Sequence, residues 1–326
     1  MLGSLLLEKV PSFITLVHSN NHSEVTDFIF VGFRVHPELH IFLFLAFLFV
    51  YTMVLLGNIG ILAIILIDPR LNTPMYFFLG NLSFIDISYS SAVAPKAIAN
   101  FLSSSKSISF VGCVVQFFFF VLFMVAEGFV LAAMAYDRFV AICSPLQYSI
   151  RMSRRLCTQL VVGSYFCGWV TSILLVSITF TLSFCTSRVI NHFYCDSYSI
   201  EKISCSNIVI NRMVSLTLSG IIIFPTLIVI MVSYVYIVST ILKIRSVEGR
   251  MKAFSTCGSH LGVVSLLYGT AFFVYLIPPN NPELRKVASV CYTFITPMLN
   301  PLIYSLRNKD VKESLKRILG KAKALL

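Results

Sequence analysis

The chain has 326 residues, of which 57% are hydrophobic and only 12% are charged. Soluble domains carry about 25% charged residues, so this composition excludes an ordinary soluble globule. Lys and Arg number 25 against 14 Asp and Glu, which gives a formal net charge of +11. A basic excess can indicate nucleic-acid binding, but nucleic-acid binders display their basic residues on a polar surface. We therefore interpret the chain as an integral membrane protein that binds no nucleic acid.

Long uncharged stretches predict the membrane spans, because a helix needs roughly 20 apolar residues to cross a bilayer. Five stretches lack charged residues, and two more are interrupted by one acid each, Asp86 and Glu127. The length of the stretches and the lack of two-residue alternation favour helices over barrel strands. We predict an all-α membrane protein with a seven-transmembrane helix bundle. The helices are expected at residues 40–67, 73–97, 108–138, 156–181, 211–242, 253–278 and 286–306.

The placement of Lys and Arg predicts the orientation, since positively charged segments stay in the cytoplasm. Segments on the side of the carboxyl terminus hold 16 of these residues and the opposite segments hold 9. We expect a multi-pass plasma-membrane protein with residues 1–39 as an extracellular tail, 40–306 as the bundle and 307–326 as a cytoplasmic tail. Glu8 and Pro11 interrupt the apolar start of the chain, which favours a flexible extension over a cleaved signal peptide.

Two features agree with an extracellular amino terminus. Asn21 begins an Asn-His-Ser glycosylation sequon. Four of the nine cysteines lie at or between the expected outer helix ends, where disulfides persist. These are Cys113, Cys185, Cys195 and Cys205. Four cysteines allow three pairings, and the residues alone do not choose among them.

The basic tail has apolar residues at helical spacing, among them Val311, Leu315 and Ile318. This pattern is typical of an amphipathic helix that lies on an anionic inner membrane surface. The alternative is a frayed tail.

Two acids, Asp86 and Glu127, lie near the middle of the second and third spans. A charge inside a bilayer is costly and is a functional hypothesis by default. Two acids at similar depth repel each other unless one is protonated or a cation lies between them. We expect a Na⁺ or proton site here, with Asn58 and Asn300 as further polar candidates. The alternative is that both acids only hydrogen-bond to Ser and Asn neighbours and stabilise the bundle.

Enzyme motifs are missing: the chain has no His-Glu-x-x-His, Gly-x-Ser-x-Gly or Gly-x-x-x-x-Gly-Lys. We expect no enzyme and no cofactor other than the Na⁺ just described. His192 and Cys195 have a spacing seen in metal sites. Cys195 is better used in a disulfide, so no metal is predicted there.

Asp137 and Arg138 stand where the third helix leaves the cytoplasmic face. Such a pair can be a solvated ion pair worth little, but its place at the end of an uncharged run favours a conformational switch. Pro225, Pro297 and Pro301 remove backbone donors within spans, so we expect bends in the fifth and seventh helices.

Four sequence motifs in order resemble the signatures of the olfactory receptor family, which belongs to the rhodopsin-like (class A) G-protein-coupled receptors. They are Pro74-Met-Tyr-Phe-Phe-Leu79, Met134-Ala-Tyr-Asp-Arg-Phe-Val-Ala-Ile-Cys143, Lys252-Ala-Phe-Ser-Thr-Cys-Gly-Ser-His260 and Pro297-Met-Leu-Asn-Pro-Leu-Ile-Tyr-Ser-Leu-Arg-Asn308. The similarity runs from about Asn21 to the basic tail. Asn72 departs from the family, which usually has His there, and an extension precedes the usual start.

The resemblance implies disulfides between Cys113 and Cys195 and between Cys185 and Cys205. It also implies an odorant site between the third, fifth, sixth and seventh helices. The implied ligand-binding residues are Phe120, Met124, Val125, Gly128, Ser219, Ile222, Phe272, Tyr275 and Thr293. They are mostly apolar with a few hydroxyls, which suits a small volatile molecule held by burial and one or two hydrogen bonds. The alternative for each is packing within the bundle.

The resemblance also implies activation by a population shift, in which the odorant binds the active conformation better than the resting one. The implied switch residues are Asp86, Glu127, Asp137, Arg138, Tyr234, Tyr268, Asn300, Pro301 and Tyr304. The sixth helix would swing outward and open a cytoplasmic cleft. The implied partners are a small-molecule odorant, membrane lipid and the heterotrimeric stimulatory olfactory G protein, which raises cyclic AMP.

Other functions stay open. A receptor of this family would act outside the nose if its ligand were a metabolite, and tissue expression would show this. A transporter or channel would use Asp86 and Glu127 along an ion path, but the hydropathy pattern contains no matching halves. An intramembrane enzyme is disfavoured because no nucleophile–base pair is found. The residues do not identify the odorant or the oligomeric state.

Overall fold

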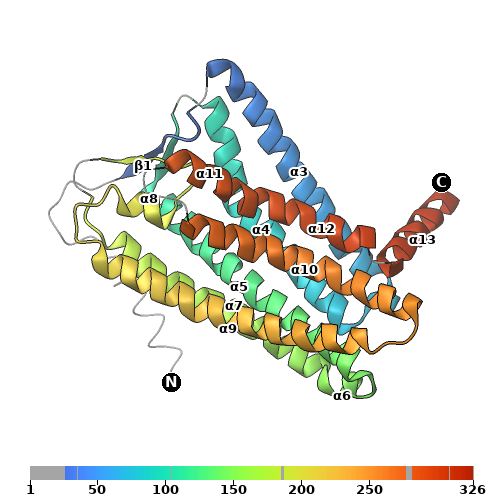
Figure 1. Ribbon diagram of the computed structural model, residues 1–326. Helices are drawn as coiled ribbons and strands as arrows, with labels where there is room; N and C mark the ends of the chain where they lie inside the picture. The colour runs from blue at the N-terminus through green and yellow to red at the C-terminus, as the bar shows by residue number, and fades with distance from the viewer. Residues whose placement is uncertain are drawn as a thin grey trace, which may run out of the picture.

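The computed structural model describes residues 26–34, 36–103, 105–184, 187–276, 281–307 and 309–325. Long helices run side by side, with short strands at one end and a separate last helix at the other (Figure 1). We name these the sheet end and the tail end. The bundle helices are α3 (Pro37–Ile67), α4 (Pro74–Leu102), α5 (Phe110–Cys143), α7 (Arg154–Phe180), α9 (Val209–Leu242), α10 (Val247–Leu276), α11 (Pro282–Val290) and α12 (Thr296–Arg307). The shorter helices are η1 (Pro69–Leu71), η2 (Pro145–Gln147), α6 (Tyr148–Arg151) and α8 (Ser197–Glu201).

Six helices of the described chain are long and apolar enough to cross a membrane, with Pro282–Tyr304 as the last. The remaining bundle helix is α4, which packs against both α3 and α5. It is less apolar because it carries the buried polar residues Ser83, Asp86 and Ser90. Those polar groups lie inside the bundle, where neighbouring helices can satisfy them. The predicted all-α seven-helix bundle is confirmed.

Three strands cap the sheet end. Strand β1 (Asp27–Phe30) pairs antiparallel with β2 (Ser107–Ser109) and parallel with β3 (Val189–Ile190), in the order β2-β1-β3. Phe28 and Phe30 of β1 are buried, as the two-residue alternation of a half-buried strand requires. The sequence analysis did not predict these strands, because they are short and their partners are distant in the chain. Asn21 lies outside the described residues.

The chain turns after β1 at Gly32, whose φ of 64° favours glycine. The buried Nζ of Lys286, at the start of the seventh helix, donates to the Gly32 carbonyl at 2.6 Å. The same Nζ also contacts the Glu283 carboxylate at 2.8 Å. A buried ammonium group needs such partners because its desolvation is costly. The amino-terminal segment is thereby fixed to the seventh helix.

The seventh helix is irregular at its centre. A π-helical turn, Cys291–Ile295, joins α11 to α12, and Pro297 follows it closely. Pro297 lacks a backbone N–H, so the regular hydrogen-bond ladder cannot pass through it. In a regular α-helix an N–H at position 297 would reach the Thr293 carbonyl, and here the Ser90 hydroxyl of α4 donates to that carbonyl at 3.3 Å instead. The irregularity therefore lies where the prolines predicted a bend.

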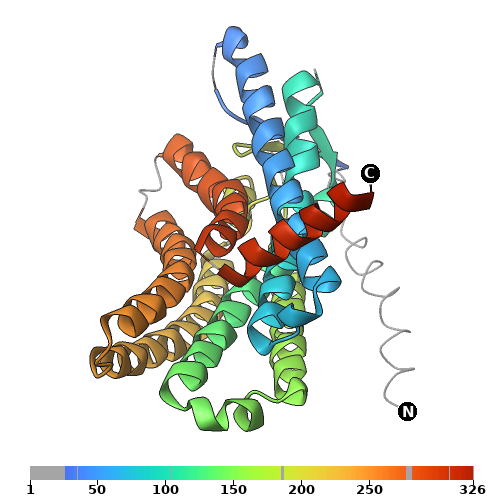
Figure 2. The same cartoon turned by 90° about the vertical axis from the view of Figure 1, so that its right-hand side faces the viewer.

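The tail forms α13 (Lys309–Leu325), which crosses the end of the bundle and does not continue α12 (Figure 2). Its own residues Val311 and Ser314 are buried. Arg317 pairs with Asp68 at 3.0 Å. The Ser314 hydroxyl, followed by the Arg70 amide and the Arg317 charge, outweighs burial and holds the pKa of Asp68 below its usual value. The amphipathic carboxyl-terminal helix is thus confirmed.

Candidate functional site

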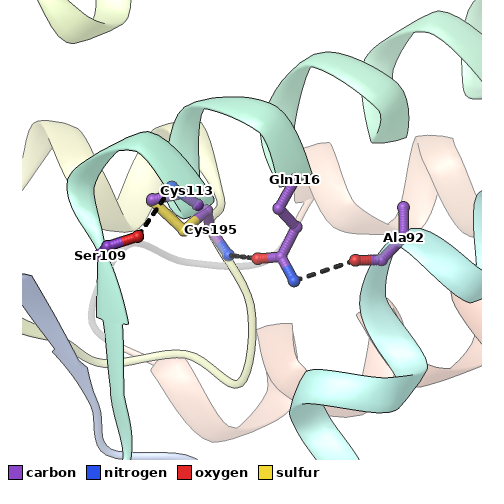
Figure 3. Close-up of a disulfide and its surroundings, with 6 residues drawn as sticks. Ala92, Ser109, Cys113, Gln116 and Cys195 are labelled. Atoms are coloured by element: carbon purple, nitrogen blue, oxygen red, sulfur yellow. Dashed lines mark hydrogen bonds between the residues drawn. A yellow bond between two sulfur atoms is a disulfide. The ribbon is translucent and has the colours of Figure 1, made fainter.

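A disulfide fixes the long connection between α7 and α9 to the bundle. Cys113, near the start of α5, is bonded to Cys195, 82 residues away in the chain. One turn along α5, Gln116 accepts a hydrogen bond from the Cys195 amide at 2.9 Å and donates to the Ala92 carbonyl of α4 at 3.1 Å (Figure 3). The predicted Cys113–Cys195 pairing is confirmed. Cys205 is also disulfide-bonded, but its predicted partner Cys185 lies outside the described residues.

Four buried aromatic residues, Tyr89, Phe120, Tyr194 and Tyr292, form what we name the aromatic cluster. The Phe120 ring centroid lies 5.1 Å from that of Tyr89 and 4.9 Å from that of Tyr194. The Tyr194 and Tyr292 hydroxyls are 2.6 Å apart, and the Tyr292 hydroxyl lies 2.8 Å from the Ser289 Oγ. The disulfide places Tyr194 here, because Tyr194 directly precedes Cys195. A loop residue thus helps to form the interior of the bundle.

His192 lies beside this cluster in the same connection. Its ring centroid is 4.5 Å from that of Tyr194, and its Nε2 lies 3.2 Å from the Ser289 Oγ. Burial, followed by the charges of Lys286 and Arg285, lowers the pKa of His192 to about 3. The imidazole is therefore neutral near pH 7, and protonating it would place a further cation beside Lys286.

A polar group of residues lies near the middle of the bundle. The Asn300 side chain donates to the Asp86 carboxylate at 2.9 Å, and Asn58 donates to the Pro297 carbonyl at 3.0 Å. The other Asp86 oxygen, Oδ1, and the Glu127 Oε1 are buried without a hydrogen-bond partner among the described residues. Unpartnered buried oxygens are costly. This arrangement is suited to holding a proton or a cation.

Side-chain hydrogen bonds connect α9 and α10. The Tyr268 hydroxyl donates to the Thr226 Oγ1 at 2.8 Å, directly after Pro225. A Cβ atom at Gly128 of α5 would lie 3.6 Å from the same hydroxyl. Nearer the tail end, the Tyr234 hydroxyl lies 2.9 Å from the His260 Nδ1. These contacts would change if α10 moved relative to α9.

His260 links three helices, and the sequence analysis did not single it out. Its Nε2 lies 3.0 Å from the Leu131 carbonyl of α5, while Nδ1 contacts Tyr234 of α9. The imidazole belongs to α10 and is fully buried. His260 ends one of the four family motifs, but a motif match does not show which helices its side chain contacts.

The tail end of α5 carries Asp137 and Arg138. The Tyr148 hydroxyl donates to the Asp137 carboxylate at 2.8 Å. The Arg138 Nε is buried and has no hydrogen-bond partner within the described part of the chain. Tyr304 of α12 is also buried. Pro301 packs closely on α3, because a Cβ at Gly57 would lie 3.1 Å from its Cγ.

Comparison with known proteins assigns this arrangement to a family. A sequence profile of the olfactory receptor family matches residues 47–322. The chain belongs to the olfactory receptor family. Olfactory receptor 9K2 of Homo sapiens is 68% identical over 308 residues, which cover 94% of this chain and 92% of that protein. Olfactory receptor 5AR1 of Mus musculus is 54% identical, with 92% of this chain and 98% of that protein covered.

Olfactory receptor 5G9 of Mus musculus is 51% identical, with 94% of this chain and 98% of that protein covered. Members of this family are class A G-protein-coupled receptors. The chain is therefore a multi-pass membrane receptor and not an enzyme.

The receptor brings together only part of the predicted ligand-binding set. Phe120, Met124, Val125 and Ile222 belong to one apolar cluster at the sheet end. Of the other members, Gly128 and Thr293 are buried and Ser219 is half-buried. The Tyr275 side chain is not among those that the structure describes. Phe272 is 65% exposed, so its side chain does not lie among the others. The set stays a prediction.

The sequence analysis did not predict several residues that lie beside this set. Tyr89, Tyr194, Ser289 and Tyr292 surround Phe120 or bond to its neighbours. The position of Tyr194 next to Cys195 was a usable signal, since the disulfide had to bring that residue to α5. The others are brought together only by the packing of α4 against the seventh helix.

Proposed function

We propose that the receptor binds a small volatile odorant beside the aromatic cluster and then activates the stimulatory olfactory G protein, which raises cyclic AMP. One observation carries this proposal. Helix α5 holds Phe120, inside the aromatic cluster, and also the half-buried Arg138 at the tail end. A single rigid helix therefore connects the candidate ligand site with the candidate switch.

The proposed orientation places the sheet end outside the cell and the tail end in the cytosol. The excess of Lys and Arg in the segments near the tail end supports it, because positively charged loops stay cytoplasmic. The amphipathic α13 supports it as well, since such helices favour the anionic inner membrane surface. Asn21 would then be available for glycosylation.

Activation depends on the difference between the affinities of the odorant for the active and the resting conformation. An apolar odorant gains roughly 25 cal/mol for each Å² of apolar surface that it buries. It shifts the receptor only if it binds the active conformation better. Movement of α10 would exchange the Tyr268–Thr226 and Tyr234–His260 contacts for others. The same movement would uncover Arg138 for the G protein.

We also propose that the polar group in the bundle holds Na⁺ in the resting state. The residues fit, because the unpartnered oxygens of Asp86 and Glu127 lie in a buried region with Asn300. An anionic, oxygen-rich group of this kind favours a hard cation. The ion would supply positive charge between two acids that otherwise repel each other.

An odorant panel tests the proposed function directly. Cells that express the full chain are exposed to uncharged volatile compounds, and cyclic AMP is recorded. We expect at least one compound to raise cyclic AMP, and Phe120→Ala to lower its potency about tenfold, since a buried aromatic contact contributes at least 1.4 kcal/mol. Phe166→Ala on the exposed face of α7 is the matched control and leaves potency unchanged. Equal losses in both variants, or ion flux without a G protein, would overturn the proposal.

A further inference from the structure

A groove of about 470 Å³ lies between α4 and α5, away from the aromatic cluster. Small-molecule sites typically have volumes of about 300–1,000 Å³, so the groove has the size of a ligand site. Ala92 of α4 lines it together with Val115 and Phe119 of α5. Val115 and Phe119 are both exposed on the surface of the bundle. The groove therefore opens toward lipid.

The sheet end of the groove is cationic. Lys96, which lies in the last two turns of α4, lines the groove and is half-buried. No acidic side chain in the part of the chain that the structure describes forms an ion pair with it. A charged ammonium at membrane depth is costly and is stabilised by an anion. The groove thus offers a site for one negative charge at this end.

The opposite end of the groove is aromatic. Phe119 and Phe123 of α5 both line it, and their rings stack with centroids 6.2 Å apart. The lining runs along α5 from Gly112 to Phe123. At about 1.5 Å per residue, this length corresponds to roughly 16 Å. An extended alkyl chain fits such a strip, because the α5 side is mostly apolar. On the α4 side, the hydroxyls of Ser88 and Ser91 are already hydrogen-bonded to the Phe84 carbonyl and the Tyr51 hydroxyl.

The wall between the two ends is rigid. Gln116 lines the groove and is buried, and both ends of its amide are used. Its Nε2 donates to the Ala92 carbonyl, and its Oε1 accepts from the Cys195 amide (Figure 3). A wall held by these bonds keeps its shape when the groove is empty or filled. It also connects the groove to the disulfide-bonded segment that carries Tyr194.

We propose that this groove binds a single-chain amphiphile with a terminal carboxylate, a long-chain fatty acid taken from the surrounding bilayer. The carboxylate lies at Lys96, and the alkyl chain runs along Val115, Phe119 and Phe123. One chain suits the groove because its lining is a single strip between α4 and α5, with Ile108 of β2 at the sheet end. The proposal does not depend on odorant binding, since none of the predicted odorant contacts lines the groove.

Photolabelling tests the proposal. The full-length receptor is purified and reconstituted into nanodiscs of neutral phosphatidylcholine, and a photoreactive palmitate analogue is crosslinked and mapped to peptides. We expect labelling on α4 and α5 that unlabelled palmitate displaces. The matching photoreactive alcohol, which lacks the charge, should label about tenfold less, as loss of one charge-assisted contact predicts.

Variants locate the site. Lys96→Gln removes the cation and Ala92→Phe fills the groove, and each should lower labelling about tenfold. Lys106→Gln makes the same charge change outside the groove lining and should leave labelling unchanged. Thermal unfolding confirms that each variant is folded. Equal labelling by the photoreactive acid and the photoreactive alcohol would overturn the proposal, and this comparison needs no variant. Undiminished labelling of Ala92→Phe would overturn it as well. Displacement by phosphatidylglycerol, but not by palmitate, would assign the groove to a phospholipid and overturn it too.

Discussion

The hydroxyls of Tyr194 and Tyr292 lie 2.6 Å apart inside the bundle. Tyr194 belongs to the connection between α7 and α9, whereas Tyr292 lies in the π-helical turn of the seventh helix. The disulfide at the neighbouring Cys195 holds Tyr194 against α5. The hydrogen bond therefore joins α5 and the seventh helix through a loop. A ligand that separates these helices must break it.

A double-mutant cycle tests this link. Tyr194→Phe removes one buried hydrogen bond and should lower the free energy of unfolding by about 1 kcal/mol. Tyr292→Phe removes the bonds to Tyr194 and Ser289 and should cost about 2 kcal/mol. The double variant should cost less than the sum by about 1 kcal/mol, measured by denaturant unfolding in bicelles. Tyr236→Phe on the exposed face of α9 is the control. Strict additivity would contradict the link.

The buried His192 predicts a dependence of stability on pH. Its pKa is lowered from 6.5 to about 3 in the folded receptor, so the unfolded chain binds the proton more readily. The contribution of this residue to the free energy of unfolding is fully present above pH 6.5 and is lost as the pH falls toward 3. Between pH 7 and 5 the loss should be about 2 kcal/mol.

The measurement compares the wild type with His192→Gln, which stays neutral at both values of pH. The difference between the two receptors isolates the histidine. Burial raises the pKa of Asp196 and of Glu201, so these acids act in the opposite direction, but they are present in both receptors. Thermal unfolding at pH 7 and 5 gives the change in stability between the two pH values for each receptor. An identical change in both receptors would show that the pKa of His192 is the same in the folded and the unfolded chain.

The proposed Na⁺ site predicts a stabilisation that depends on the ion. Replacing choline by Na⁺ should raise the unfolding temperature of the wild type. Once the site is nearly full, each tenfold increase in Na⁺ should add about 1.4 kcal/mol. Asp86→Asn should remove this dependence, because the site loses a charged oxygen ligand. Asp27→Asn, at the exposed start of β1, removes the same charge elsewhere, and this variant should keep the Na⁺ dependence of the unfolding temperature. An unchanged Na⁺ response in Asp86→Asn would exclude the site.

Arg138 predicts a loss of signalling without a loss of folding. Arg138→Ala removes a half-buried side chain whose buried Nε has no hydrogen-bond partner among the described residues. Its removal should abolish odorant-driven cyclic AMP, because the proposed switch loses the group that meets the G protein. Surface expression, measured by antibody staining of intact cells, should be retained. Arg151→Ala in the neighbouring α6 is the control. Full signalling by Arg138→Ala would exclude the switch assignment.

The helices were predictable because the bilayer imposes a length and an apolar composition on each of them. Even α4 could be placed, since the single acid Asp86 interrupts an otherwise uncharged stretch. The partner of Cys113 followed from the family resemblance, because cysteine positions alone allowed three pairings. These features depend on local sequence or on one motif.

Other features depend on contacts between distant residues. The four residues of β1 are too few for a strand pattern, and their partners at Ser107–Ser109 and Val189–Ile190 become visible only in the fold. The bond between Tyr194 and Tyr292 likewise needs the packed bundle. Phe272 shows the converse limit: matching a family position locates a residue along a helix, but it does not predict how exposed the side chain is.

The bond from Lys286 to the Gly32 carbonyl has a consequence for biosynthesis. Residue 32 leaves the ribosome early, whereas its partner belongs to the seventh and last bundle helix. Until that helix is inserted, β1 is held by its pairing with β2 and β3 and by the contacts of Phe28 with Phe110 and Phe184, all of which precede the seventh helix in the chain. The Lys286 bond is therefore the last of these ties to form during synthesis, and it closes the cap only after the seventh helix has emerged.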